Sequence, residues 1–163
     1  MGVVRDQSIK NTTIFYIGMA IGAINTVLVY PNVFNNQPEH WGLIQILVAY
    51  AFIASTFSQL GVPRTYMRFF PRVEAKQQFL FFGIILSISG FILALLAYYL
   101  FKDQLFLFLN ASELLMNNFY YVIILVFCIS FFELFGSVSR SYLNAVVPVF
   151  LDEIFLKFYS LVV

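Results

Sequence analysis

Four long stretches of this chain contain no charged residue, and they separate short segments in which the charges are clustered. The uncharged stretches cover residues 11–38, 40–63, 77–101 and 114–132. A helix that crosses a bilayer needs about 20 mainly apolar residues, whereas a barrel strand needs only about 9–11 residues of alternating polarity. Because the stretches are long and apolar on all sides, they predict helices. We place four transmembrane helices at about residues 13–31, 42–63, 78–101 and 118–136.

The C-terminal segment has a different pattern. After Arg140 the chain is weakly apolar, contains Pro148 and three charges, and then continues as an apolar run up to Val163. This pattern predicts that residues of about 148–163 form the start of a fifth helix. We expect the chain to be an N-terminal fragment of a longer protein. The alternative is a complete protein with a short amphipathic helix on the cytoplasmic surface.

Composition supports the membrane assignment and excludes several other classes. Hydrophobic residues make up 61% of the chain and charged residues 10%, and the net charge is +1. So few polar groups could not cover a soluble domain, and so small a charge does not suit a nucleic-acid binder. A single cysteine, Cys128, excludes a cysteine-based zinc site. The sequence contains no catalytic motif, so we do not expect an enzyme, a cofactor or a metal site.

Basic residues predict the orientation. Loops on the cytoplasmic side of a membrane are enriched in Lys and Arg. On one side of the predicted spans lie Arg5, Lys10, Arg64, Arg68, Arg72, Lys76, Arg140 and Lys157. Only Lys102 lies on the other side. We therefore expect a multi-pass protein with a cytoplasmic N-terminus.

Small residues recur at four-residue spacing within the predicted spans. The pairs are Gly18/Gly22, Ala51/Ser55, Ala54/Ser58 and Gly83/Ser87. This spacing places both members on one helix face, where two backbones can approach closely. We expect these faces to pack helices against one another inside the protein, rather than to form a homodimer.

Three polar residues are candidates for contact with a substrate. Asn25 lies deep in the first span and could form an interhelical hydrogen bond or contact substrate. Glu133 lies near the cytoplasmic end of the fourth span, where it could line a cavity or pair with Arg140, two turns further along the same face.

The loop after the second span contains arginines at i, i+4 and i+8, namely Arg64, Arg68 and Arg72. In a helical stretch they would share one face, and we expect three aromatic residues of the same stretch to face lipid: Tyr66, Phe69 and Phe70. The arginines could set topology and touch anionic headgroups. Alternatively, because a guanidinium binds phosphate through a planar fork, they could recruit a lipid diphosphate.

Several segments together resemble the start of a polysaccharide flippase. They are residues 8–12, Gly18 and Gly22, Pro31, residues 40–45, residues 59–63, residues 68–71 and residues 140–153. The chain is similar over nearly its whole length to bacterial O-antigen and exopolysaccharide translocases. These belong to the multidrug/oligosaccharidyl-lipid/polysaccharide exporter superfamily.

The resemblance implies a protein of two helical bundles. The present sequence would supply part of the N-terminal bundle, and the remaining C-terminal part of the same chain would supply the rest. It also implies a place in the bacterial cytoplasmic (inner) membrane and a role in polysaccharide or lipopolysaccharide biosynthesis. The substrate would be a lipid-linked oligosaccharide on a polyprenyl diphosphate, moved by alternating access. Two alternatives stay open. One is a drug/cation antiporter of the same superfamily, which an acidic group deep in the first bundle would favour. The other is a complete four-helix membrane scaffold without transport activity.

Overall fold

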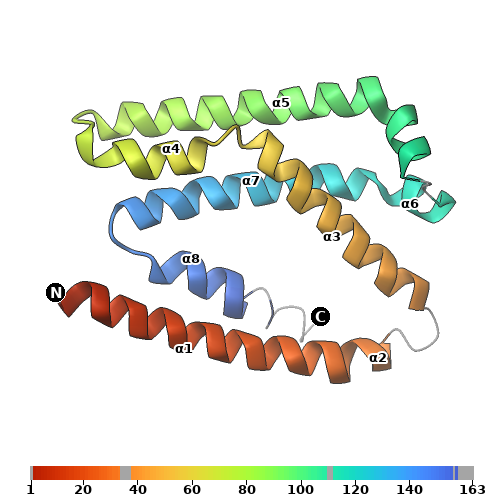
Figure 1. Cartoon of the computed structure of the whole chain (residues 1–163), viewed down its shortest axis with the longest axis horizontal. Helices are drawn as coiled ribbons and strands as arrows, with labels where there is room; N and C mark the ends of the chain where they lie inside the picture. Colours follow the sequence, from red (N-terminus) through yellow and green to blue (C-terminus); the bar gives the residue numbers. More distant parts are fainter. Residues whose placement is uncertain (1, 34–37, 110–111, 156, 158–163) are drawn as a thin grey trace. The chain divides into compact units, whose positions relative to one another are not determined.

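The computed structural model describes residues 2–33, 38–109, 112–155 and 157, and every regular element in these ranges is helical (Figure 1). The chain divides into two compact units. Unit 1 consists of Met1–Trp41 and Tyr142–Val163, and unit 2 of Gly42–Ser141. Within the described residues, four helices are long and apolar enough to cross a membrane, as many as the complete spans that the sequence predicts.

Unit 1 is built on the first span. Helix α1 (Gly2–Ile24), the π-helix η1 (Asn25–Val29) and α2 (Tyr30–Val33) follow one another without a break. Together they contain the candidate span Arg5–Val33, which is longer at both ends than the predicted 13–31.

The predicted fifth helix begins at Val146, two residues before the expected position. Helix α8 (Val146–Phe150) continues into a second π-helix, η3 (Leu151–Phe155), and both pack against α1. Residue 156 and residues 158–163 of this prediction lie outside the described residues.

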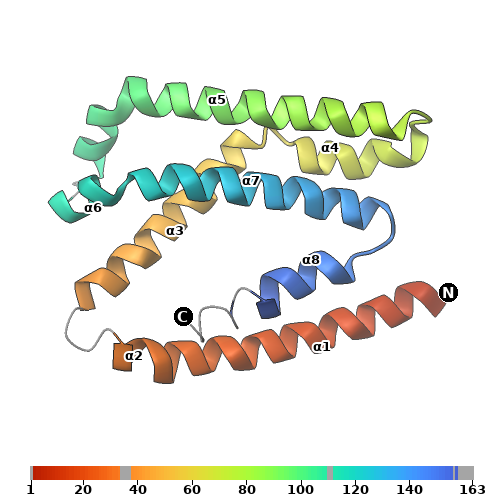
Figure 2. The same ribbon diagram turned by 180° about the vertical axis from the view of Figure 1, so that it is seen from behind.

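Unit 2 contains the other three spans. Its elements are α3 (Pro38–Ser58, of which 42–58 belong to unit 2), α4 (Val62–Phe69), the 3-10 helix η2 (Phe70–Arg72), α5 (Lys76–Phe108), α6 (Glu113–Asn118) and α7 (Tyr120–Ser141). Helices α4, α5 and α7 contact one another, and both views show them running side by side (Figures 1 and 2).

The second span is shorter than expected. The prediction continued it to residue 63, but α3 ends at Ser58 and a turn follows. Leu60 and Gly61 have φ of 49° and 72°, and left-handed residues end an α-helix. Pro63 then occupies the first turn of α4, where its missing N–H costs no hydrogen bond. The segment before the arginines is therefore a turn and a new helix rather than the end of α3.

The third and fourth spans are longer than expected. Helix α5 continues to Phe108 instead of residue 101, and α7 to Ser141 instead of residue 136. The 33 residues of α5 correspond to about 50 Å of helix, which exceeds the roughly 30 Å hydrocarbon core. Figure 1 shows the last turns of α5 bending toward α6.

Small residues form the contacts between the helices of unit 2 near α4. Ser55, Ser58, Gly83, Ser87 and Gly90 are all buried. A Cβ on Gly90 would overlap the carbonyl oxygen of Ser58, so α5 touches the end of the α3 backbone there. The expectation that the small residues serve packing within the protein is confirmed at these positions.

The opposite end of unit 2 has an aromatic and aliphatic core. Leu47 and Ala51 of α3 are buried against Leu115 of α6 and Val122 of α7, with Phe119 between these last two helices. The rings of Tyr98 and Phe119 stack with centroids 5.3 Å apart and an interplanar angle of 8°. Large rigid side chains thus hold α5 and α7 together at this end.

Candidate functional site

The amphipathic helix α4 positions the first two arginines. Val62, Pro63 and Tyr66 are buried, while Arg64 and Arg68 are exposed on the other side of the helix. The i, i+4 spacing places both guanidinium groups on one face, as predicted.

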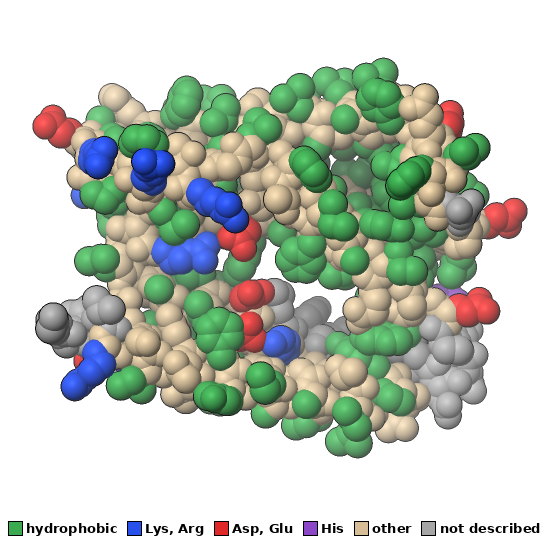
Figure 3. Space-filling model, in the orientation of Figure 1, with side chains coloured by type: hydrophobic (Ala, Val, Ile, Leu, Met, Phe, Trp, Pro, Cys, Tyr) green, Lys and Arg blue, Asp and Glu red, His purple; other side chains and the backbone are tan. Residues whose placement is uncertain are grey.

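The third arginine does not continue this face. Because α4 ends at Phe69, Arg72 lies in the 3-10 turn η2, so a row of three on one α-helical face is wrong. Arg72 is also exposed. Figure 3 shows Lys and Arg side chains gathered over α4 and the adjoining end of α7 in unit 2.

Two of the three aromatic residues expected to face lipid are instead buried in the protein. Tyr66 is 2% exposed and Phe70 4% exposed, whereas Phe69 is exposed as predicted. The Tyr66 ring stacks on Phe79 at 4.9 Å. A Cβ on Gly83 would lie 3.8 Å from Tyr66, an ordinary van der Waals distance, so the ring packs directly against α5 at this position.

Glu133 and Arg140 form an ion pair on α7. Arg140 Nη2 donates to Glu133 Oε2 at 3.1 Å, and both side chains are partly exposed. The pair confirms the predicted contact along one face of the helix. Because each charge is neutralised by a partner on the same helix, the position of Glu133 in the span does not require a cavity beside it.

Asn25 belongs to unit 1, whereas the other candidate residues belong to unit 2. Its side chain is 2% exposed, and its Nδ2 donates to the backbone carbonyl of Lys157 at 2.8 Å. This interaction confirms the interhelical hydrogen bond that was one of the two expectations for Asn25 and ties the first span to the segment after η3.

Unit 1 contains another ion pair, and neither of its two residues was a predicted site residue. Lys157 Nζ donates to Glu153 Oε2 at 2.5 Å, and the pair lies against the glycine face of α1. A Cβ on Gly18 would lie 2.7 Å from the Glu153 carbonyl oxygen, and one on Gly22 would lie 3.7 Å from the Lys157 side chain. Gly18 is next to the midpoint of the span Arg5–Val33, so Glu153 is an acidic group beside the middle of that span.

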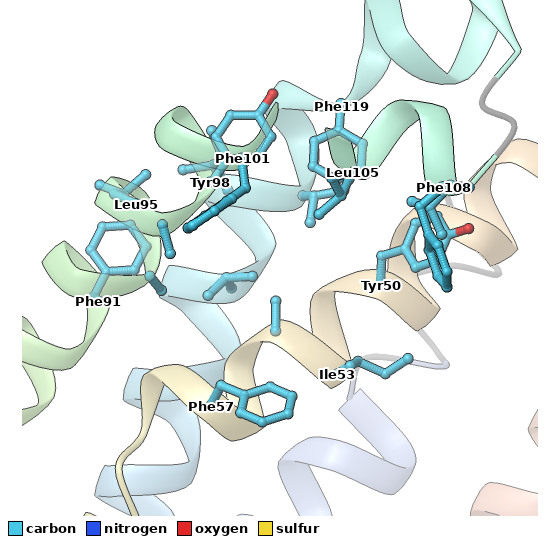
Figure 4. A pocket seen from close by; sticks show the side chains of 17 residues that line it. Tyr50, Ile53, Phe57, Phe91, Leu95, Tyr98, Phe101, Leu105, Phe108 and Phe119 are labelled. Atoms are coloured by element: carbon cyan, nitrogen blue, oxygen red, sulfur yellow. The ribbon is translucent and has the colours of Figure 1, made fainter. Parts of the chain in front are cut away.

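Unit 2 also contains an apolar groove of about 580 Å³, partly open, between α3, α5 and the start of α7. Its walls are almost entirely hydrocarbon and aromatic side chains. Figure 4 shows Ile53 and Phe57 of α3 facing Leu95 and Phe101 of α5 across one space, with Phe119 beside them. The groove therefore suits an apolar ligand rather than a polar one.

Within the described residues there is no group of three or more His, Cys, Asp or Glu side chains that could hold a metal ion. None of the protein-family models, curated proteins and solved structures compared with the chain matches it. The resemblance to polysaccharide flippases stays a prediction.

Proposed function

We propose that the chain is the N-terminal part of a flippase that moves a glycan linked to polyprenyl diphosphate across the bacterial cytoplasmic membrane. The observation that carries this proposal is the exposed pair Arg64 and Arg68 on the outer face of α4. The helix joins two candidate spans and buries its apolar face on α5 and α7.

The chemistry of this face fits a diphosphate. Guanidinium groups bind phosphate oxygens through two parallel N–H···O bonds, and two groups one turn apart can engage neighbouring phosphates. Among the described residues, the ion pairs Glu133–Arg140 and Glu153–Lys157 involve neither Arg64 nor Arg68. The charges of Arg64 and Arg68 are therefore not neutralised by Glu133 or Glu153. In this proposal the arginines attract the lipid-linked glycan to the cytoplasmic entrance.

Translocation itself then needs no covalent step. Two bundles rock about a central cavity, and the large polar head group passes about 30 Å of hydrocarbon while its lipid tail stays in the bilayer. This chain contributes four spans, and we expect the remaining C-terminal part of the same protein to supply the second bundle.

The test is a flipping assay with the full-length protein in proteoliposomes. A fluorescent polyprenyl-diphosphate oligosaccharide is the probe, and transfer between leaflets is the readout. Arg64→Gln/Arg68→Gln should raise the half-saturating substrate concentration about tenfold or more, because each charge-assisted hydrogen bond contributes about 1.5–3 kcal/mol. Lys10→Gln, at an exposed basic residue of α1, is the matched control and should leave the value unchanged. Equal effects of both variants would contradict the role of α4.

One observation favours a second function, a drug/cation antiporter with the same topology. An acidic group deep in the first bundle would favour the antiporter, and Glu153 lies beside the middle of the first span. Ionisable groups within membrane spans often mark ion pathways. An antiporter should exchange a cationic dye for sodium ions or protons that move down an imposed gradient. It should not flip the lipid-linked glycan.

A further inference from the structure

The turn between α3 and α4 lies beside the middle of α5. A Cβ on Gly90 would lie 2.1 Å from the carbonyl oxygen of Ser58, the last residue of α3. Gly90 is next to the midpoint of the uncharged stretch 77–101, and both views show the turn against this part of α5 (Figures 1 and 2). Because α3 is inclined to α5, it ends near the middle of the hydrocarbon region, although its length would be sufficient to cross it.

Helices α4 and η2 continue from this turn toward the start of α5 at Lys76. A Cβ on Gly83 would lie 3.7 Å from Val62 and 3.8 Å from Tyr66, so α4 packs on the half of α5 nearer Lys76. The 8 residues of α4 and the 3 residues of η2 rise about 18 Å together, which is close to half of the roughly 30 Å hydrocarbon core. The second span is thus one discontinuous helix, made of α3 and α4, with its interruption inside the membrane.

Two serines face each other across the contact between α5 and α7 at this depth. The two helices are antiparallel, and three contacts fix their register: a Cβ on Gly83 with Leu134 at 3.8 Å, the Phe91 and Phe127 rings at 5.3 Å, and the Tyr98 and Phe119 rings at 5.3 Å. Ser87 is one turn after Gly83, and Ser130 is one turn before Leu134, so this register places the two serines opposite each other. Both are buried.

Helix α3 adds two more serines at its end. The Ser58 carbonyl touches Gly90, which is one turn from Ser87 and is buried on the same face of α5. Ser55 is one turn before Ser58 and is also buried. We call these four residues the serine layer: Ser55, Ser58, Ser87 and Ser130.

The contact between α3 and α7 places the same residues together. Ala51 of α3 and Val126 of α7 are buried in one cluster, and the two helices run in the same general direction (Figure 1). One turn further along each helix are Ser55 and Ser130. The serine layer therefore joins α3, α5 and α7 at the interruption of the second span.

Two hydroxyl groups of the serine layer have unused hydrogen-bonding capacity. Ser55 Oγ donates to the Phe52 carbonyl of its own helix at 2.9 Å. Within the described part of the chain, Ser58 Oγ and Ser130 Oγ have no hydrogen-bond partner, although each residue is only 1% exposed. Since a buried hydroxyl without a partner is unfavourable, the pair indicates an occupant that supplies the missing interactions.

The helix ends at the interruption favour a cation over an anion. An α-helix has a partial negative charge at its C-terminal end, and α3 ends at Ser58. The N-terminal end of α4 offers few donors to an anion, because the Val62 N–H donates to the Gln59 carbonyl at 2.9 Å and Pro63 has no N–H. Arg64, the next residue, is exposed on the opposite side of α4. Interrupted helices in membrane transporters bind Na⁺ through such C-terminal ends and backbone carbonyl groups.

We propose that the serine layer binds one sodium ion through the hydroxyl oxygens of Ser58 and Ser130 and backbone carbonyl oxygens at the end of α3. Hard cations prefer oxygen ligands, and neutral oxygens compensate a single charge better than a double charge in a medium of low dielectric constant. Such a site has no sequence motif, because its ligands are hydroxyl and backbone oxygens. It requires neither glycan transport nor the Glu153 carboxylate, so it does not depend on either proposed function.

The first test measures the affinity of the full-length protein for Na⁺. Radioactive sodium is bound to detergent-solubilised protein in a scintillation proximity assay, with choline chloride keeping the ionic strength constant. Ser58→Ala/Ser130→Ala should lower the affinity about tenfold or more, because a buried contact between a hydroxyl and a charge contributes about as much as a charge-assisted hydrogen bond. The matched control is Ser89→Ala/Ser137→Ala, since these two hydroxyl groups donate to carbonyls of their own helices at 2.8 Å and 2.6 Å. Equal affinity of the two double variants, or no Na⁺ binding by the wild type, would overturn the proposal.

The second test uses wild-type protein and therefore does not depend on the folding of a variant. Hydrogen exchange of backbone amides is followed by mass spectrometry in sodium chloride and in choline chloride. Na⁺ should slow exchange severalfold in the peptide that contains the turn at residues 59–61, since a bound ion holds the end of α3 in place. If the serine layer holds only ordered water, exchange in this peptide will not depend on Na⁺ and the proposal is wrong. Protection of the segment around Glu153 in place of the turn would assign the ion to that carboxylate and would equally contradict the serine site.

Discussion

The ion pair between Glu153 and Lys157 should stabilise unit 1 only as a pair. The two charged groups lie against Gly18 and Gly22 beside the middle of the first span, and Lys157 Nζ is 2.5 Å from Glu153 Oε2. Lys157→Met leaves the carboxylate without its counter-charge in a medium of low dielectric constant. A charged side chain at the centre of a span costs about 2.5–3.5 kcal/mol on insertion scales. We expect the free energy of unfolding to fall by about 3 kcal/mol.

Removing both charges should restore most of that loss. Glu153→Gln alone removes the carboxylate that Lys157 Nζ contacts and should cost about as much as Lys157→Met, whereas the double variant keeps two uncharged side chains of similar size. Replacing both partners of an ion pair in a medium of low dielectric constant is often close to neutral. The double variant should therefore lie within about 1 kcal/mol of the wild type, far from the sum of the two single losses.

The assay is reversible unfolding of the full-length protein in mixed micelles of a mild detergent and SDS, followed by helicity. A control is available in the pair Glu133–Arg140, whose side chains are 44% and 36% exposed near the end of the fourth span. Breaking that pair should cost about 1 kcal/mol or less. The reasoning would be refuted if the Glu153 and Lys157 variants were additive, or if they cost no more than the control.

Three further perturbations test other parts of the account. Gly90→Ala should lower the free energy of unfolding by about 1–3 kcal/mol, since its Cβ would overlap a carbonyl oxygen at the end of α3. Gly42→Ala, in α3 with nothing within 4 Å, should not lower it and should raise it by up to about 1 kcal/mol. Tyr66→Ala should cost about 3–5 kcal/mol in the same assay because it removes a buried ring, and Phe69→Ala, at an exposed position, should cost much less. A reporter fused after Met67 should be active in the cytoplasm, and periplasmic activity would show that the orientation is reversed.

The positions of the charges were enough to predict the spans. A charge costs too much inside hydrocarbon to appear there by chance, so the uncharged stretches mark four helices that the structure contains. Their ends were harder to place. Gly61 and Pro63 are ordinary signals of a helix end and a helix start, and they could have separated α3 from α4. The positive φ of Leu60 has no such signal in the sequence.

Packing inside a membrane explains the other errors. In water an apolar residue on a surface helix usually faces the core, but in a bilayer it can face either protein or lipid, so Tyr66 and Phe70 could not be distinguished from Phe69 by type. The glycines of α1 were identified as a contact face, but their partner was not. Glu153 and Lys157 lie more than 130 residues further along the chain than the glycines that they contact, and one sequence does not show which helix packs on which.

Deletion of the complete gene tests the proposed transport function most directly. Cells without the protein should accumulate the lipid-linked oligosaccharide on the cytoplasmic face of the membrane and lose the corresponding glycan from their surface. Lipid-linked glycan is measured by extraction and mass spectrometry, and its sidedness by access to a membrane-impermeant glycan-modifying enzyme. If surface glycan were unchanged while sensitivity to cationic drugs rose, the flippase proposal would be wrong and the antiporter would be supported.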